Sequence, residues 1–353
     1  MSERRRLPEL QRLNVTFCLL VVFIHAASQS VSTLDKLGWK YVLVLMCQRL
    51  AFVSVPGFFL ISGVKLTLPE TRATDYPRWW LRRAKALLLP YVIAATIYYG
   101  YFVRQGYFVF SAGDFLRRLV LGRLASPFYF LVALTQFIML APLFRRLAER
   151  YDPAVLLPFA LGVMWISGMY ANSIVKLFAP TAEFHYGDRV FTTYLFYYLA
   201  GCCIGARYDG FPAFLEKNRR LIATLFVCFA AADAVLSVLH FSERRSVPFL
   251  ELIHTLYLIS GILTLYDLAL RRRSALSRPA LAVDRASFLI YLYHCLTLAV
   301  AQDFAANHLP GLRPGGVLLF RLAAAYGVTI ACCVLWQRLS RRVTSLFRPQ
   351  TET

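Results

Sequence analysis

The stretch LNVTFCLLVVFIHAASQSVSTL, residues 13–34, decides the fold class. It runs for 22 residues without a charged side chain, and about 20 mostly apolar residues are enough for a helix to cross the hydrocarbon core of a bilayer. The run is too long for the apolar part of a cleaved secretory signal, and no small-residue cleavage site fits it. Residues 13–34 are therefore predicted to form a retained first transmembrane helix.

The composition agrees with a chain that lies mostly in a membrane. Of the 353 residues, 58% are apolar and 16% are charged, whereas roughly a quarter of a soluble domain is charged. The net charge of +20 comes from short Arg clusters between apolar runs, a pattern of membrane topology rather than of nucleic-acid binding. The eight cysteines lie in apolar stretches without metal-ligand spacing, so neither a disulfide scaffold nor a metal site is expected.

The hydropathy pattern predicts an all-α polytopic membrane protein with about ten transmembrane helices. The chain is expected to be a single transmembrane domain over residues 1–353, with no appended soluble domain. The predicted spans are residues 13–34, 41–64, 86–103, 124–144, 153–175, 190–206, 221–242, 246–270, 286–302 and 314–337.

The distribution of basic residues predicts that both termini are cytoplasmic. With the N-terminus inside, the inner segments hold 26 Lys and Arg and the outer loops hold 11, as the positive-inside rule requires. The outer segment 104–123 carries four arginines in an amphipathic pattern. It is expected to form an interfacial helix rather than another span.

Two ionisable side chains are expected at similar depth near the outer side of the membrane. His25 lies about 18 Å into the first span at 1.5 Å per residue, and Arg49 lies about eight residues from the outer end of the second. A buried neutral imidazole can act as a general base, and an Arg beside it could stabilise an oxyanion. The alternatives are a histidine bonded only for structure and an arginine that snorkels to the interface.

Further candidates follow along the chain, each with a structural alternative. Pro56, Gly57, Ser62 and Gly63 predict either a kink that lines a tunnel or close helix packing. The basic residues at the mouth of the third span could bind the phosphates of a nucleotide-like donor or simply follow the positive-inside rule. These basic residues are Arg82, Arg83 and Lys85.

A second mid-membrane histidine, His294, lies in SFLIYLYHCL with Tyr291 nearby as a possible hydrogen-bond partner. Asp233 is the acid deepest within a predicted span, and it could orient a histidine, pair with an arginine or relay protons in a transporter. The remaining four histidines lie in or near loops or span ends and are given no role. They are His185, His240, His254 and His308.

Six segments in chain order carry a family resemblance over nearly the whole sequence. They are LLVVFIHA (19–26), VPGFFLISG (55–63), RRAKALLLPY (82–91), SPFYFLVALTQFIMLAPLF (126–144), YLFYYLAGCCIGA (194–206) and SFLIYLYHCL (287–296). In this order and with this number of spans, they resemble the acyltransferase-3 family of integral membrane acyltransferases.

The resemblance implies an acyl-CoA-dependent O-acyltransferase of the bacterial inner membrane. Members commonly transfer acetyl groups from cytoplasmic acyl-CoA to hydroxyls of surface glycans or related acceptors. His25 matches the family's catalytic histidine and His294 its late histidine, while Ser62 matches the serine of its Ser-Gly pair. Arg82, Arg83 and Lys85 fall on its basic stretch at the donor side.

Two positions depart from the family pattern. Asn14 stands where the family often has an arginine, with Arg12 two residues earlier, and Tyr129 stands where it has a tryptophan. Tyr129 and Tyr291 are retained as expected substrate contacts or acyl carriers.

The resulting hypothesis has His25 as general base and Arg49 as oxyanion donor, in transfer from acetyl-CoA to a glycan or lipid-linked sugar. The expected partners are acyl-CoA, the glycan and membrane lipids, with no tightly bound cofactor and no nucleic acid. The alternative is a glycan transporter or flippase without bond chemistry, against which stands the lack of a detectable inverted repeat.

Overall fold

The structure is a computed structural model, and it describes residues 7–71, 75–178, 181, 184–272 and 274–346. The described residues form helices and connecting loops without a strand. The α-helices are α1 (Pro8–Thr33), α2 (Trp39–Ala51), α3 (Ser54–Thr67), α4 (Tyr76–Arg104), α5 (Ala112–Val120), α6 (Tyr129–Met139), α7 (Ala141–Arg150), α8 (Pro153–Phe178), α9 (Leu195–Ala206), α10 (Phe211–Phe241), α11 (Leu250–Arg271), α12 (Arg278–His308), α13 (Pro314–Ala323) and α14 (Ile330–Leu346).

The predicted helical membrane fold is confirmed. Among the described residues, eight helical stretches are long and apolar enough to cross a membrane, and α6 with α7 makes a ninth if this pair, bent by 65°, is one span. The predicted span 190–206 corresponds to the shorter apolar stretch Phe191–Ala206. The count of ten and the cytoplasmic location of both termini stay predictions.

Local sequence explains where several helices begin and break. The Asp75 side chain accepts a hydrogen bond from the Arg78 N–H at the start of α4, and Ser277 does the same for Ala280 at the start of α12. Such N-caps satisfy backbone donors that a helix start leaves free. The predicted span 41–64 corresponds to α2 and α3 together, which are long enough to form one span. The two helices are separated at Phe52 and Val53.

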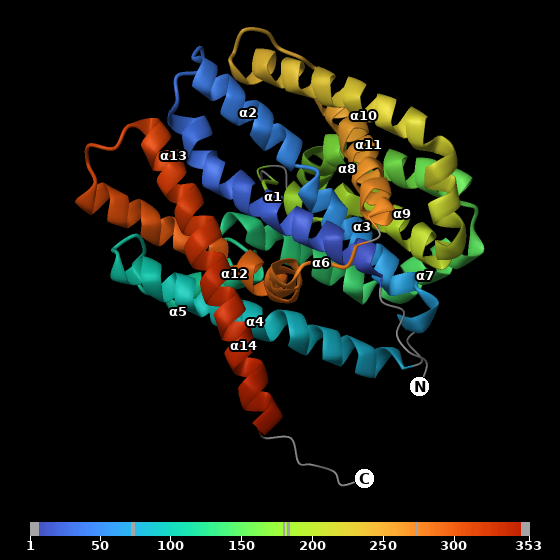
Figure 1. Ribbon diagram of the computed structural model, residues 1–353, viewed down its shortest axis with the longest axis horizontal. Helices are drawn as coiled ribbons and strands as arrows, with labels where there is room; N and C mark the ends of the chain where they lie inside the picture. The colour runs from blue at the N-terminus through green and yellow to red at the C-terminus, as the bar shows by residue number, and fades with distance from the viewer. Residues whose placement is uncertain (1–6, 72–74, 179–180, 182–183, 273, 347–353) are drawn as a thin grey trace.

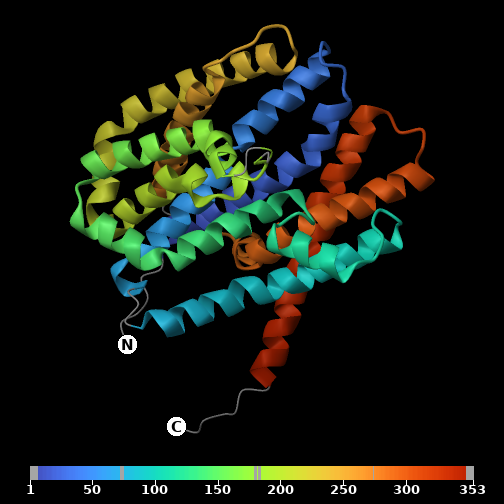
Figure 2. The ribbon, with the colours of Figure 1, turned by 180° about the vertical axis from the view of Figure 1, so that it is seen from behind.

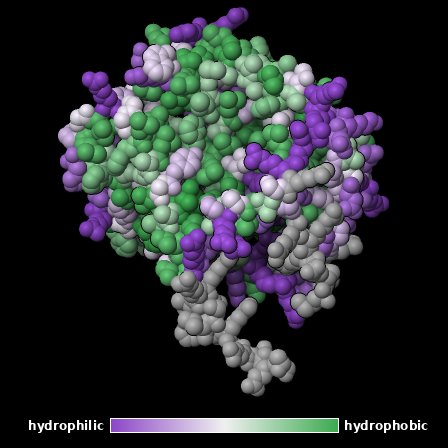
Figure 3. Space-filling model, viewed as in Figure 1, coloured by the Kyte–Doolittle hydropathy of each residue, from purple (hydrophilic) through white to green (hydrophobic). Residues whose placement is uncertain are grey.

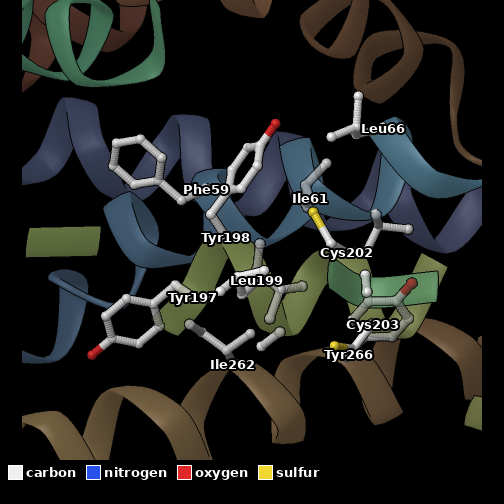
Figure 4. Close-up of a cluster of buried hydrophobic side chains, with 14 of the residues drawn as sticks. Phe59, Ile61, Leu66, Tyr197, Tyr198, Leu199, Cys202, Cys203, Ile262 and Tyr266 are labelled. Carbon is white, nitrogen blue, oxygen red and sulfur yellow. The ribbon is translucent and has the colours of Figure 1, made fainter. Parts of the chain in front are cut away.

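Helices α3 and α9 pack closely against each other at glycine residues. A Cβ at Gly63 would lie 2.2 Å from the Tyr198 carbonyl oxygen, and one at Gly201 would lie 2.0 Å from the Leu60 oxygen. Small residues in membranes allow such backbone approach, so close packing is the role of Gly63. The buried side chains around this contact, including Phe59 and Tyr198, form the core drawn in Figure 4.

Helix α1 lies at the centre of the molecule, between two groups of helices. In Figures 1 and 2, α1 runs through the centre, with α2 and α10 toward one edge and α4 and α12 toward the other. The start of α1 lies on the side opposite the α1–α2 and α10–α11 loops. Segment 104–123, predicted to be interfacial, contains only the short helix α5, which buries none of its side chains.

The outer surface suits a lipid environment. Large apolar side chains such as Phe159, Leu177 and Trp336 are more than 60% exposed. Figure 3 shows apolar side chains across most of one face, with polar ones gathered toward its edges. Exposed apolar area of this extent is rare in soluble monomers, so the chain is an integral membrane protein.

Candidate active site

The two mid-membrane histidines predicted from the sequence face each other. His25 on α1 and His294 on α12 have ring centroids 5.1 Å apart, with ring planes inclined by 52°. His294 is fully buried, whereas His25 is half-buried. The packing of α1 against α12 therefore brings residues 269 positions apart into one site.

The hydrogen bond of His294 fixes which of its nitrogens can accept a proton. Its Nδ1 lies 3.0 Å from the Ile290 carbonyl oxygen, which can only accept, so we assign the proton to Nδ1. In the neutral ring, Nε2 then carries a free lone pair. Within the described ranges, this buried Nε2 has no hydrogen-bond partner. His294 thus offers a free hydrogen-bond acceptor in the interior of the helical bundle.

Cys295 completes the cluster. One ligand atom each of His25, His294 and Cys295 lies within 4.8 Å of the others. Imidazole and thiolate are ligands that zinc and copper accept. In the part of the chain that the structure describes, these three side chains are the set that could hold a metal ion.

Arg321 on α13 is the cation that the structure places beside this cluster. Its Nε donates to the Ala26 carbonyl oxygen at 3.0 Å and its Nη2 to that of His25 at 3.1 Å. Its Nη1 donates to the Gln302 Oε1 at 3.3 Å. Arg321 is 7% exposed, and no carboxylate among the described residues lies within ion-pair distance of it. A buried, uncompensated positive charge favours negative charge nearby.

The sequence places Arg321 inside the predicted span 314–337 but indicates no partner for it. The available signal was the general rule that an intramembrane arginine marks a functional position. Its two carbonyl partners in α1 lie almost 300 positions away, so only the folded chain connects it to His25.

Arg49, expected beside His25, is bound to a carboxylate on another helix. Its Nη2 lies 3.0 Å from the Asp233 Oδ1 on α10, and the His254 Nδ1 on α11 lies 3.0 Å from the same oxygen. The neighbouring residue, Gln48, contacts α1 by donating to the Ile24 carbonyl oxygen at 3.0 Å. Arg49 as an oxyanion donor therefore stays a prediction, and the geometry favours Arg321 for that role.

Arg49, Asp233 and His254 thus form a second polar cluster. Asp233 both pairs with an arginine and bonds a histidine, two of the roles considered for it. His254 was set aside as lying near a span end, but it is 9% exposed and bonded to a fully buried carboxylate. The sequence could not place it because its partners come from two other helices.

The three other polar candidates differ in their relation to the pair. Tyr291 lies one turn before His294, with ring centroids 6.4 Å apart, and its hydroxyl donates to the Pro127 carbonyl oxygen. Tyr129 stacks on Tyr194 at 6.3 Å between centroids. The Ser62 hydroxyl donates to the Phe58 carbonyl oxygen in its own helix at 2.8 Å, so its proton is already engaged.

The predicted donor-binding residues Arg82, Arg83 and Lys85 are exposed near the start of α4. Further along the same helix, the Tyr98 hydroxyl donates to the Leu292 carbonyl oxygen at 3.1 Å, close to His294. Fifteen residues of helix between Arg83 and Tyr98 measure about 22 Å. A donor with phosphates at the basic residues would thus have to extend about that far to reach the histidines.

Asn14, where the family often has an arginine, joins α1 to α12 through hydrogen bonds. Its amide donates to the Asp284 Oδ1 at 2.8 Å and to the Ser287 hydroxyl at 3.0 Å, which ties α1 to α12. Arg12 instead donates to the Ala269 carbonyl oxygen at 2.9 Å, at the end of α11. Arg12 and Asn14 therefore contact different helices.

Comparisons with known proteins agree with this architecture. The family model described as an acyltransferase domain matches residues 9–337, so the chain belongs to the acyltransferase-3 family, a class of membrane enzymes that transfer acyl groups. Two relatives from Staphylococcus epidermidis, one of them from strain RP62A, are each 22% identical over 302 residues, which is 82% of this chain and 81% of theirs. Both are named probable poly-beta-1,6-N-acetyl-D-glucosamine export protein. No solved structure matches the chain at a significant level.

Proposed function

We propose that the protein is an O-acyltransferase that moves an acetyl group from cytoplasmic acetyl-CoA to a hydroxyl of a glycan or lipid-linked sugar. The observation that carries the proposal is the pair of histidine rings 5.1 Å apart beside the buried cation of Arg321. Family membership supports acyl transfer as the reaction class. The donor, the acceptor and a location in a bacterial inner membrane are parts of the proposal.

The reaction balances with one proton and one bond exchange. His25 accepts the proton of the acceptor hydroxyl, and the oxygen attacks the thioester carbonyl carbon. The tetrahedral oxyanion collapses, the carbon–sulfur bond breaks, and His25 returns the proton to the CoA thiolate. The His294 ring packs against that of His25, with centroids 5.1 Å apart, and the positive charge of Arg321 stabilises the oxyanion. Loss of a positioned general base lowers the rate about 10²–10⁴-fold.

The donor side of the proposal rests on the exposed basic residues of α4. Arg82, Arg83 and Lys85 would bind the phosphates of CoA, because Lys and Arg form charge-assisted hydrogen bonds to phosphate oxygens. The pantetheine arm would then extend along the bundle toward the histidines. In this scheme CoA is a substrate that leaves after each turnover, so no tightly bound cofactor is required.

Glycan export without bond chemistry remains the second candidate, because two observations favour it. The two relatives are named as probable export proteins. The buried Arg49, Asp233 and His254 form a polar cluster between helices, which is the kind of group that marks a transport pathway.

Radiolabelled acetyl-CoA separates the two candidates. Purified wild type, His25→Ala and the control His308→Ala are each incubated with labelled donor and a β-1,6-linked N-acetylglucosamine oligomer. His308 is exposed at the end of α12, so its loss should be silent. Label on the sugar with wild type and control, and a rate at least about 10²-fold lower with His25→Ala, would support the proposal.

The contrary result is equally clear. If folded wild type releases no CoA, but moves a separately radiolabelled oligomer across the membrane of proteoliposomes, export replaces acyl transfer. Activity unchanged in His25→Ala would exclude His25 as the base.

A further inference from the structure

A cavity of about 330 Å³ lies beside the second polar cluster, between α1, α2 and α10. It is near the α1–α2 and α10–α11 loops, on the side opposite the start of α1 (Figures 1 and 2). Its volume is within the range of small-molecule sites in proteins, about 300–1,000 Å³. The reaction described above leaves this cavity without a task.

The lining combines aromatic faces with hydrogen-bonding groups. Tyr41, Phe52 and Phe241 contribute rings, and Gln48 and Arg49 contribute polar atoms. The guanidinium carbon of Arg49 lies 5.7 Å from the Phe52 ring centroid and 5.6 Å from that of Phe241. A sugar ring has both apolar C–H faces and hydroxyls around its edge, so this mixture suits it.

Arg49 has a donor available for such a ligand. It is 7% exposed, and its buried Nε has no hydrogen-bond partner in the described part of the chain. A buried donor without a partner costs free energy unless a ligand or water satisfies it. Because the Nε is itself enclosed by protein, a hydroxyl or ring oxygen in the cavity would meet the edge of the Arg49 guanidinium that lines the cavity.

The charges around the cavity are already compensated. Arg49 pairs with Asp233 at 3.0 Å, and Lys36, which also lines the cavity, pairs with Glu243 from the α10–α11 loop. An anionic ligand would have to compete with both carboxylates. The arrangement therefore favours an uncharged ligand over a carboxylate or a phosphate.

One residue of the cavity lining contacts the backbone of α1 next to His25. Gln48 lines the cavity and donates to the Ile24 carbonyl oxygen at 3.0 Å, one residue before His25. A ligand seated here would thus approach His25 from the side opposite the basic start of α4.

We propose that this cavity is the acceptor subsite and that it holds one uncharged pyranose unit, with Arg49 as hydrogen-bond donor. The inference rests on the proposed function and adds the place and chemical class of the acceptor. The donor and the acceptor would then reach His25 from opposite sides of the membrane, without crossing paths.

Two variants and a matched control test the subsite in the full-length protein. Val31→Trp places a large ring in the lining of the cavity, and Arg49→Lys keeps a positive charge near Asp233 but removes the planar guanidinium. The control is Lys40→Gln, an exposed cation of α2 outside the cavity. Initial rates of CoA release are measured against the concentration of a β-1,6-linked N-acetylglucosamine disaccharide and, separately, of acetyl-CoA.

The expected result is a selective loss of acceptor affinity. Both variants should raise the KM for the disaccharide about tenfold or more, since one hydrogen bond to a charged group is lost or the space is filled. The KM for acetyl-CoA should not follow, and the control should behave as wild type. An unchanged disaccharide KM in both folded variants, or a rise confined to acetyl-CoA, would overturn the subsite.

A binding measurement keeps this test separate from that of the proposed function. Equilibrium dialysis with radiolabelled disaccharide needs no turnover. Binding by wild type that Val31→Trp abolishes would support the subsite even if no acyl transfer occurred. Transfer by wild type with unaltered disaccharide binding in both variants would leave the proposed function standing and remove the subsite.

Discussion

The Arg321→Met variant tests whether the positive charge of Arg321 serves catalysis or only the packing of α13 against α1. The guanidinium donates three hydrogen bonds, two of them to consecutive carbonyl oxygens of α1 at His25 and Ala26. Met fills a similar space with an apolar, adaptable chain. The variant therefore removes the positive charge beside the histidine pair while leaving the helix contact largely filled.

The expected effect on catalysis follows from the position of the charge. Removing one preorganised group that stabilises an oxyanion lowers kcat about 10²–10³-fold, or about 2.7–4 kcal/mol. The charge belongs to the transition state rather than to the bound donor, so the KM for acetyl-CoA should stay near its wild-type value. A loss confined to kcat is the signature of such an interaction.

Although Arg321→Met should lower activity, it should not lower the stability of the protein. A buried ion without a partner carries a desolvation penalty of several kcal/mol, and apolar replacements of buried charges are often neutral or stabilising. The carbonyls of His25 and Ala26 can still accept the N–H groups four residues on in α1. Arg321→Met should therefore keep or raise the thermal midpoint, as expected where activity and stability trade against each other.

The assay pairs CoA release with thermal unfolding of the same detergent-purified samples, and Arg313→Met is the control because Arg313 is exposed at the start of α13. A kcat within about threefold of wild type, well short of the expected loss, would refute the catalytic role in folded Arg321→Met. A parallel fall of activity and thermal midpoint would show that Arg321 only holds α13 against α1.

Three other perturbations test the fold around the site. Gly63→Ala forces a Cβ against a backbone oxygen and should destabilise by at least about 1–3 kcal/mol; Gly100→Ala, with open space in α4, should leave the midpoint unchanged or raise it slightly in the same thermal assay, because Ala is the better helix former. Asp233→Asn leaves two buried partners of the carboxylate and should cost about 3–5 kcal/mol in unfolding free energy, and an unchanged midpoint would contradict this. The hydrogen bond between Lys36 and Glu243 lowers the pKa of the carboxyl and raises that of the ammonium. The stabilisation is then complete between the ordinary pKa values of the two groups, and it disappears as pH falls through the lowered pKa of Glu243 or rises through the raised pKa of Lys36. The midpoint difference between wild type and Glu243→Gln should follow this window, and a pH-independent difference would refute it.

Hydropathy and ionisable residues were enough to predict much of this molecule. Long apolar runs must become helices because the bilayer leaves no other way to satisfy the backbone. His25 and His294 stood out because polar groups are rare at that depth. The sequence could also supply the family, since its motifs recur in fixed order.

The sequence could not predict in the same way which side chains bind one another across helices. Arg49 was expected beside His25, but a helix turns by about 100° per residue, so Gln48 contacts α1 while Arg49 points to Asp233. Such rotation depends on how whole helices pack. For the same reason, neither His254 nor Arg321 could be assigned a partner from one sequence.

The glycine contact between α3 and α9 also has a consequence for biogenesis. Gly63 and Gly201 are separated by roughly 140 residues, and ribosomes add about 5–20 residues per second, so α3 waits about 7–28 s for its partner. During that interval its glycine face meets only lipid, the insertion machinery or earlier helices. Because the bare backbone of α3 requires one particular later helix, the order of translation itself becomes a condition for assembling this membrane domain.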